Sequence, residues 1–225
     1  MRFKGCIFDL DGVIVDTAGY HFQSWKKLAT MLNINFTEVD NERLKGVSRM
    51  ASLEIVLEIG NLTLDNKTKE EYAALKNKWY LDYIGRMMPD EILPGSLEFI
   101  SELKNAGIKV ALGSASKNTP LILERLGIEK LFDAVADGNI VSKAKPDPEV
   151  FITAAKMLGI PPKDCVVFED ALAGVEAALN AGMLCVGIGS EKILTKAHFV
   201  ITGLDKMSLK KLKVLAKKSD NEQLL

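Results

Sequence analysis

The 225-residue sequence has little of several features that would assign a protein class at once. It has three cysteines, Cys6, Cys165 and Cys185, and none of them belongs to a C-x-x-C pair. Each lies within or beside an apolar run. We therefore expect three reduced, buried thiols that act as small hydrophobic residues.

Long apolar runs and an excess of charge of either sign are also missing. No window approaches the ~20 apolar residues of a membrane span, and no apolar h-region precedes the first acidic residues. The formal net charge of −1 argues against a general binder of nucleic acid or of membrane surfaces. We expect a cytoplasmic monomer whose partner is a small molecule.

What the sequence does contain is ordinary globular composition, with 48% hydrophobic and 26% charged residues. Short, nearly continuous apolar runs indicate strands that are buried on both faces, as in parallel sheets. These runs are Gly5–Phe8, Lys109–Leu112, Cys165–Phe168 and Leu184–Ile188, with His198–Ile201 as a weaker candidate. Helical patterns alternate with them, at Leu97–Lys104, Pro148–Leu158, Gly174–Leu179 and Ser208–Lys218. The alternation predicts an α/β fold with a doubly wound parallel sheet.

The stretch from residue 17 to residue 88 differs from the rest. It contains helical spacing at His21–Leu32, Met50–Ile59 and Lys69–Arg86, and no clear strand. We interpret it as a helical cap domain, 17–88, inserted into a core domain made of 1–16 and 89–225.

Polar residues collect where the predicted strands end. Asp9 and Asp11 follow the first strand, Ser114 follows the second, and Glu169 and Asp170 follow the third. Lys145, next to Pro146, lies between the second and third strands. Ligands of doubly wound sheets bind outside these carboxyl ends, so the sequence predicts one site at this edge.

Two acids two residues apart have several readings. Asp9 and Asp11 point to one side if the strand continues through them. A calcium loop fails, because its positions 5, 6 and 12 are Val13, Ile14 and Tyr20. A solvated turn remains possible for Asp9 and Asp11 alone. The third acid, Asp170, favours an Mg²⁺ site that a phosphate completes.

Asp9-x-Asp11-Gly12, Ser114, Lys145-Pro146 and Glu169-Asp170, in this order, resemble the four motifs of the haloacid dehalogenase-like superfamily. The residues between 17 and 88 resemble the helical cap of its sugar-phosphate mutases. The resemblance covers nearly the whole chain. It implies isomerisation of β-glucose 1-phosphate to glucose 6-phosphate through a bound 1,6-bisphosphate.

The resemblance also implies roles for individual residues. Asp9 would be the nucleophile that becomes an aspartyl phosphate, and Asp11 the general acid and base. Mg²⁺ would be held by Asp9, Asp170 and the Asp11 carbonyl, with Glu169 at or near the metal. Ser114, Ala115 and Lys145 would hold the transferring phosphoryl group. Substrate contacts would come from His21, Trp25, Lys45, Gly46, Arg49, Ser52, Lys76, Ser116, Lys117 and Asn118.

Plainer interpretations stand beside these roles. Lys76 on a charged helix is usually a solvated side chain, and a lone histidine such as His21 is more often structural. Ala171 and Val15 depart from the residues common in the superfamily. Two other functions remain open: a phosphatase acting on small sugar phosphates, and a phosphoacceptor signalling domain.

Overall fold

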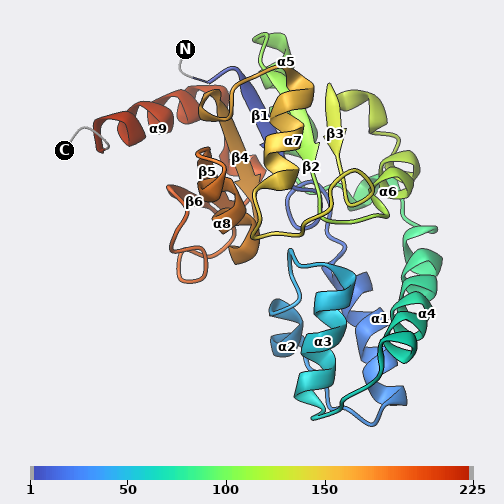
Figure 1. Cartoon of the computed structure of the whole chain (residues 1–225). Helices are drawn as coiled ribbons and strands as arrows, with labels where there is room; N and C mark the ends of the chain where they lie inside the picture. The colour runs from blue at the N-terminus through green and yellow to red at the C-terminus, as the bar shows by residue number, and fades with distance from the viewer. Residues whose placement is uncertain (1–2, 223–225) are drawn as a thin grey trace.

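The computed structural model of the chain describes residues 3–222. They form a six-stranded parallel sheet, with a separate group of helices below it in the view of Figure 1. The strand order is β3-β2-β1-β4-β5-β6. The strands are β1 (Gly5–Phe8), β2 (Lys109–Gly113), β3 (Ala134–Ala136), β4 (Cys165–Glu169), β5 (Leu184–Ile188) and β6 (Phe199–Ile201).

Helices cover both faces of this sheet and generate two separate apolar cores. Ile7 of β1 faces a core shared with α7 (Glu149–Leu158) and α8 (Leu172–Asn180). Phe8, its neighbour, faces a core shared with α5 (Ser96–Asn105), α6 (Thr119–Leu126) and α9 (Leu209–Glu222). Because consecutive strand residues point to opposite faces, one short apolar run supplies both cores.

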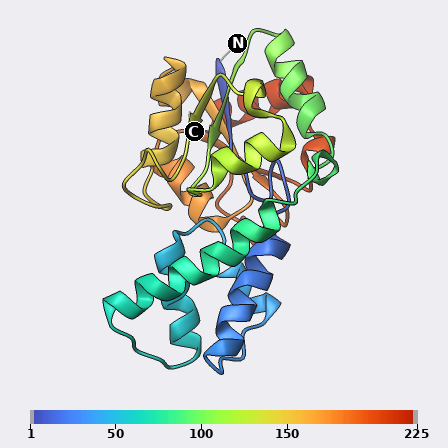
Figure 2. The same ribbon diagram turned by 90° about the vertical axis from the view of Figure 1, so that its right-hand side faces the viewer.

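The inserted segment forms four helices with an apolar core of their own (Figure 2). They are α1 (Ala18–Met31), α2 (Glu38–Glu42), α3 (Arg49–Ile59) and α4 (Asn66–Ile84). Trp25, Phe36 and Leu53 are buried among them. These helices are called the cap below.

The chain enters and leaves the cap at one place. Val15 pairs with Asp11 on one side and with Ile92 on the other. The Leu93 N–H donates to the Ile14 carbonyl over 2.9 Å. The two connections are therefore joined to each other directly below the end of β1.

Most of the expected elements are confirmed, with boundaries that shift by a few residues. The five predicted strands are β1, β2, β4, β5 and β6. The strand β3, helix α2 and helix α6 were not expected. Four short 3₁₀ segments complete the described chain, at Pro89–Glu91, Glu129–Leu131, Pro162–Asp164 and Leu204–Lys206. Among residues 3–222, every helix is too short or too polar to pass through a bilayer.

Candidate active site

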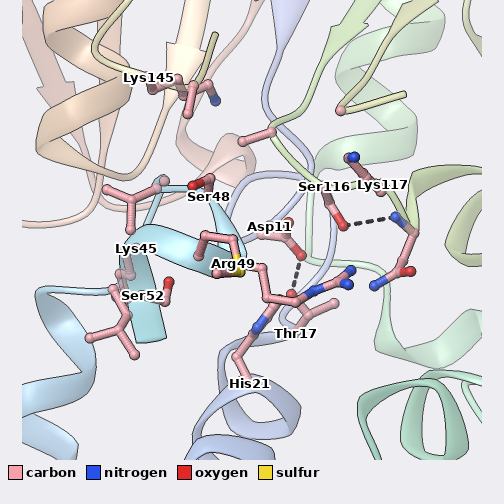
Figure 3. A pocket seen from close by; sticks show the side chains of 18 of the residues that line it. Asp11, Thr17, His21, Lys45, Ser48, Arg49, Ser52, Ser116, Lys117 and Lys145 are labelled. Carbon is pink, nitrogen blue, oxygen red and sulfur yellow. Dashed lines mark hydrogen bonds between the residues drawn. The ribbon is translucent and has the colours of Figure 1, made fainter. Parts of the chain in front are cut away.

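The strand register brings the predicted site residues to one edge of the sheet. Phe8 lies opposite Leu112 on β2 and opposite Phe168 on β4. The residues that follow these three positions therefore leave the sheet side by side. A cavity of about 590 Å³ lies between this edge and the cap (Figure 3).

Most of the residues predicted from sequence line this cavity. The lining includes Asp9, Asp11, His21, Trp25, Lys45, Gly46, Arg49, Ser52, Lys76, Ala115, Ser116, Lys117, Asn118, Lys145 and Asp170. Ser114 and Glu169 are buried behind that wall, with no exposed surface.

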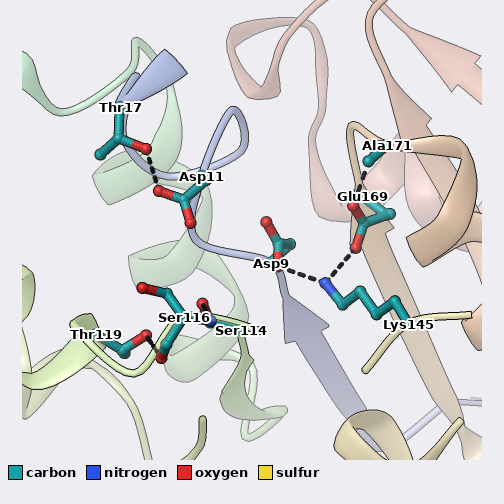
Figure 4. A network of polar contacts seen from close by, with 9 residues as sticks. All are labelled: Asp9, Asp11, Thr17, Ser114, Ser116, Thr119, Lys145, Glu169 and Ala171. Atoms are coloured by element: carbon teal, nitrogen blue, oxygen red, sulfur yellow. Dashed lines mark hydrogen bonds and ion pairs between the residues drawn. The ribbon is translucent and has the colours of Figure 1, made fainter. Parts of the chain in front are cut away.

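Lys145 joins two carboxylates at the centre of the site (Figure 4). Its Nζ lies 2.5 Å from Asp9 Oδ1 and 2.8 Å from Glu169 Oε2. Burial alone would lower the pKa of Lys145, but the two carboxylates outweigh it and hold the pKa above its usual range. Burial raises the pKa of Glu169 to about 7, and Asp9 adds to that shift.

A third carboxylate, Asp170, lies beside the two that Lys145 binds. Oxygen atoms of Asp9, Glu169 and Asp170 lie within 4.8 Å of one another. The pKa of Asp170 is raised well above its usual range, first by burial and then by the charges of Glu169 and Asp9. One Lys145 cannot balance three acids, and a hard divalent cation bound by oxygen ligands would. The residues present therefore fit Mg²⁺.

Gly12 allows Asp170 to reach this cluster. Its φ is +78°, which favours glycine, and a Cβ at this position would lie 2.1 Å from Asp170 Oδ2. The glycine of the Asp9-x-Asp11-Gly12 motif thus has a steric cause.

Asp11 is bound by Thr17, the residue that precedes the first helix of the cap. Asp11 does not continue the strand, because β1 ends at Phe8. The strand therefore does not continue through both acids, but Asp9 and Asp11 still line the same cavity. Asp11 accepts a hydrogen bond from the Thr17 hydroxyl at the start of the cap. Burial raises the pKa of Asp11 to about 6, and the charge of Asp9 adds to this.

The loop after β2 is ordered by its own hydroxyl groups. Ser114 Oγ accepts from the Ser116 N–H over 3.1 Å, and Ser116 Oγ accepts from the Asn118 N–H over 3.1 Å. Thr119 Oγ1 donates to the Ser116 carbonyl over 2.9 Å. Ser114 therefore shapes the loop that carries Ala115, Ser116 and Lys117 into the cavity.

On the cap side, Lys76 is buried rather than solvated, so the plainer interpretation of this residue is wrong. Its side chain is on the inner face of α4 with 2% exposure. Nζ lies 2.9 Å from His21 Nδ1 and between the rings of Trp25 and Tyr80, at 4.7 and 4.6 Å from their centroids. Burial lowers the pKa of Lys76 to about 7, and the charge of Arg49 contributes.

Two contacts connect the cap and the core across the cavity. Asn118 Nδ2 donates to Asn77 Oδ1 on α4 over 2.9 Å. Gly46, with φ +72°, lies so close to the core that its Cβ would be 3.0 Å from the Cβ of Ala171. The small side chain at 171 therefore makes room for the loop that carries Lys45.

Several residues of the site were not found from sequence. Thr17, Asn41 and Gly174 lack a motif of their own. Gly174, near the start of α8, lies against the Glu169 carboxyl group, and a Cβ there would be 2.0 Å from its carboxyl carbon. The one available signal for Gly174 was its place in a predicted helix. Glycine weakens a helix, so a glycine there suggests that a neighbouring group needs the space.

Three features occur together here: a six-stranded parallel sheet, a cluster of carboxylates with a buried lysine at its edge, and an inserted helical cap. This combination is typical of α/β enzymes that transfer phosphoryl groups. A family model of haloacid dehalogenase-like hydrolases matches residues 3–182. The chain belongs to the haloacid dehalogenase-like family.

Relatives within the family narrow the assignment. The chain is 44% identical to a β-phosphoglucomutase of Bacillus subtilis over 208 residues, which cover 92% of each protein. It is also 29% identical to a fructose-1-phosphate phosphatase of Escherichia coli, covering 83% of this chain and 97% of that protein. A β-phosphoglucomutase structure from Clostridium difficile superposes with a TM-score of 0.92 at 38% identity, covering 96% of this chain and 98% of the other.

Proposed function

We propose that the chain converts β-glucose 1-phosphate into glucose 6-phosphate as a β-phosphoglucomutase, through β-glucose 1,6-bisphosphate. The single observation that carries this proposal is the pair Asp9 and Asp11. The two acids line one cavity but have different partners, Lys145 for Asp9 and Thr17 of the cap for Asp11. High identity to a mutase over most of the chain supports the same reaction.

Asp9 is the nucleophile in this proposal. A carboxylate oxygen of Asp9 attacks phosphorus, the bond to the sugar oxygen breaks, and an aspartyl phosphate forms. Lys145 holds Asp9 in place and neutralises charge on the transferring group. In the loop after β2, the Ser114 N–H donates to the Ala136 carbonyl and the Ser116 N–H to Ser114 Oγ. The N–H groups of Ala115 and Lys117, which line the cavity, would bind the phosphate oxygens.

Asp11 moves the proton. It protonates the leaving sugar oxygen and, in the return step, takes the proton from the attacking hydroxyl group. A carboxyl group with a raised pKa can carry this proton near neutral pH. The glucose 1,6-bisphosphate intermediate then reorients, so that its other phosphate faces Asp9.

The metal belongs to the core. Asp9, Asp170 and the Asp11 carbonyl would hold Mg²⁺, with Glu169 beside it, and a bound Mg²⁺ supplies charge stabilisation for the phosphoryl group. The remaining predicted contacts lie on the cap and on the loop after β2. Arg49 would grip the distal phosphate, because a guanidinium group can donate two parallel hydrogen bonds.

The proposal extends to the setting of the enzyme. The division into a core, 1–16 and 89–225, and a cap, 17–88, is part of the proposal. The separate apolar cluster around Trp25 supports it, while Tyr80 and Ile84 at the end of α4 pack in the cluster of the core. Monomeric state and a cytoplasmic location are proposed with it. The three buried thiols, each free of a disulfide, support a reducing compartment.

A phosphatase is the second candidate, since similar proteins carry that name. It shares every step up to the aspartyl phosphate and then uses water. The third possibility, a signalling domain, has no use for Asp11 or for a cap.

One experiment separates the mutase from the phosphatase. The protein receives β-glucose 1-phosphate, Mg²⁺ and a trace of glucose 1,6-bisphosphate, and both glucose 6-phosphate and free phosphate are measured. We expect glucose 6-phosphate as the main product. Mostly free phosphate would overturn the mutase reaction and leave the nucleophile unchanged.

A further inference from the structure

Asn41 is a buried polar residue in the wall of the cavity that the proposed mechanism does not use. It lies on α2 of the cap, lines the cavity and is 7% exposed. Its Oδ1 is buried and has no hydrogen-bond partner among residues 3–222. Buried polar atoms in native proteins are nearly always paired with protein, water or a ligand, because an unpaired one destabilises the fold.

The backbone holds this side chain in place. The Asn41 N–H donates to the Thr37 carbonyl over 3.2 Å, and the Asn41 carbonyl accepts from the Leu44 N–H over 3.0 Å. Thr37 in turn forms a capping box with Asp40. These bonds fix the turn that carries the side chain. Because Asn41 lines the cavity, a ligand bound there can supply the missing partner.

The chemistry of the amide restricts what that partner is. Oδ1 accepts hydrogen bonds and cannot donate, so a phosphate dianion, which also only accepts, cannot pair with it. If the amide were turned over, the buried Nδ2 would need an acceptor instead. A hydroxyl group meets both cases, because it donates and accepts. The sugar ring of the proposed substrate has three hydroxyl groups that carry no phosphate, at carbons 2, 3 and 4.

We propose that Asn41 binds one of these ring hydroxyl groups and thereby selects the sugar. The inference rests on the proposed function for the identity of the sugar. Lys45, one turn further along the chain, lines the same wall. Asn41 would therefore contact the ring beside a cationic side chain, and the two contacts together would fix the orientation of the bound sugar.

A double-mutant cycle between protein and substrate tests this. kcat/KM is measured for β-glucose 1-phosphate and its 2-deoxy, 3-deoxy and 4-deoxy analogues, with the wild type, Asn41→Ala and Glu38→Ala. Glu38 is the matched control, because it is exposed on the same helix and does not line the cavity. Thermal midpoints establish that each variant folds, and Asn41→Ser replaces the alanine variant if that one does not fold.

We expect the wild type to lose about 10-fold in kcat/KM on one of the three analogues, the size of one hydrogen bond between uncharged groups. Asn41→Ala should lose a similar factor on the normal substrate and nothing further on that analogue. It should keep the wild-type losses on the other two, and Glu38→Ala should match the wild type on all four. If the losses multiply for every analogue, the hydroxyl contact does not exist.

A failure of the proposed function is visible in the same data. If the wild type releases only free phosphate from β-glucose 1-phosphate, the mutase reaction is wrong. The cycle is then measured as the rate of phosphate release. As before, losses that do not multiply on one analogue support the contact of Asn41 with a hydroxyl group, and losses that multiply on every analogue overturn it.

Discussion

Lys76 has its amine where water cannot solvate it, and this has an energetic consequence at the scale of one residue. Its pKa of about 7 lies below the ordinary 10.5, so the folded state resists the proton that the unfolded state binds. Burial of the charged Lys76 therefore destabilises the folded state. This destabilisation is at its full size below pH 7, declines as the pH rises, and disappears above about pH 10.5.

We therefore expect Lys76→Met to stabilise the protein while it weakens substrate binding. The gain in unfolding free energy should be about 5 kcal/mol at pH 6 and near zero above about pH 11, because the pKa is lowered from 10.5 to about 7. Urea unfolding at both pH values measures it. Lys78→Met, exposed on the same helix, is the control. An equal gain at both pH values would contradict the electrostatic origin.

Asp11 and Asp16 give a matched pair for the acid–base role. Asp11→Asn should lower kcat/KM by about 10³-fold without unfolding the protein, because the amide cannot transfer the proton. Asp16→Asn should remain near wild type, since the exposed Asp16 only accepts from the Ala18 N–H, which an amide oxygen can also do. Steady-state kinetics measure both. Unchanged phosphate transfer in Asp11→Asn would favour a signalling domain.

Gly174 should not tolerate even one methyl group. Alanine normally stabilises a helix by ~0.5–1 kcal/mol over glycine. At 174 it would displace the Glu169 carboxyl group, which bonds Lys145, so we expect Gly174→Ala to lower kcat/KM by about 10²-fold. Gly19→Ala in α1 is the control, because a Cβ there meets nothing within 4 Å. Comparable activity of both variants would remove Glu169 from the mechanism.

At the scale of elements, a helix or strand could be predicted when its apolar pattern was long and clearly different from the flanking residues. The strand β1 and the helix α4 were found because apolar runs and helical spacing persist over the whole element. The edge strand β3 has only Ala134, Val135 and Ala136 between polar residues, and α2 has five residues. Their existence depends on partners that are distant in sequence, which local patterns do not contain.

The hydrogen bond between Asn77 and Asn118 joins two elements, α4 of the cap and the start of α6. We expect Asn77→Ala to weaken the contact between cap and core and so to raise the share of free phosphate over glucose 6-phosphate several-fold, as water reaches the phosphorylated Asp9. Both products are measured in one assay. Lys78→Ala is the control, and an unchanged product ratio would show that this bond does not hold the cap.

At the scale of the molecule, the site is a product of topology. Asp9 and Asp170 are far apart in sequence and meet because β1 and β4 pair in parallel. Three of the four motifs were predictable because they follow apolar runs, and Lys145 was predictable because Pro146 follows it in the order of motifs that the superfamily shares. The partners that hold them, Thr17 for Asp11 and Gly174 for Glu169, were not, because those contacts cross between elements.

Metal binding should stabilise the whole fold, because the acids that repel each other come from two strands. We expect Mg²⁺ to raise the thermal midpoint by about 5 °C and EDTA to abolish turnover. Asp170→Asn should be more stable than wild type in EDTA and insensitive to Mg²⁺, because one of the repelling charges is gone. Differential scanning fluorimetry measures this, with the exposed Asp82→Asn as control. A full Mg²⁺ response in Asp170→Asn would place the ion elsewhere.

The pairing of Val15 with Ile92 has a consequence for how such a protein can change over evolution. The cap begins and ends at one spot, so the path of the chain through the sheet is the same whatever is inserted there. The segment between the two tethers can be exchanged as a cassette, while β1, β2 and β4 keep the reacting groups in register. A new segment would still have to supply the group that binds Asp11, which Thr17 supplies in this chain.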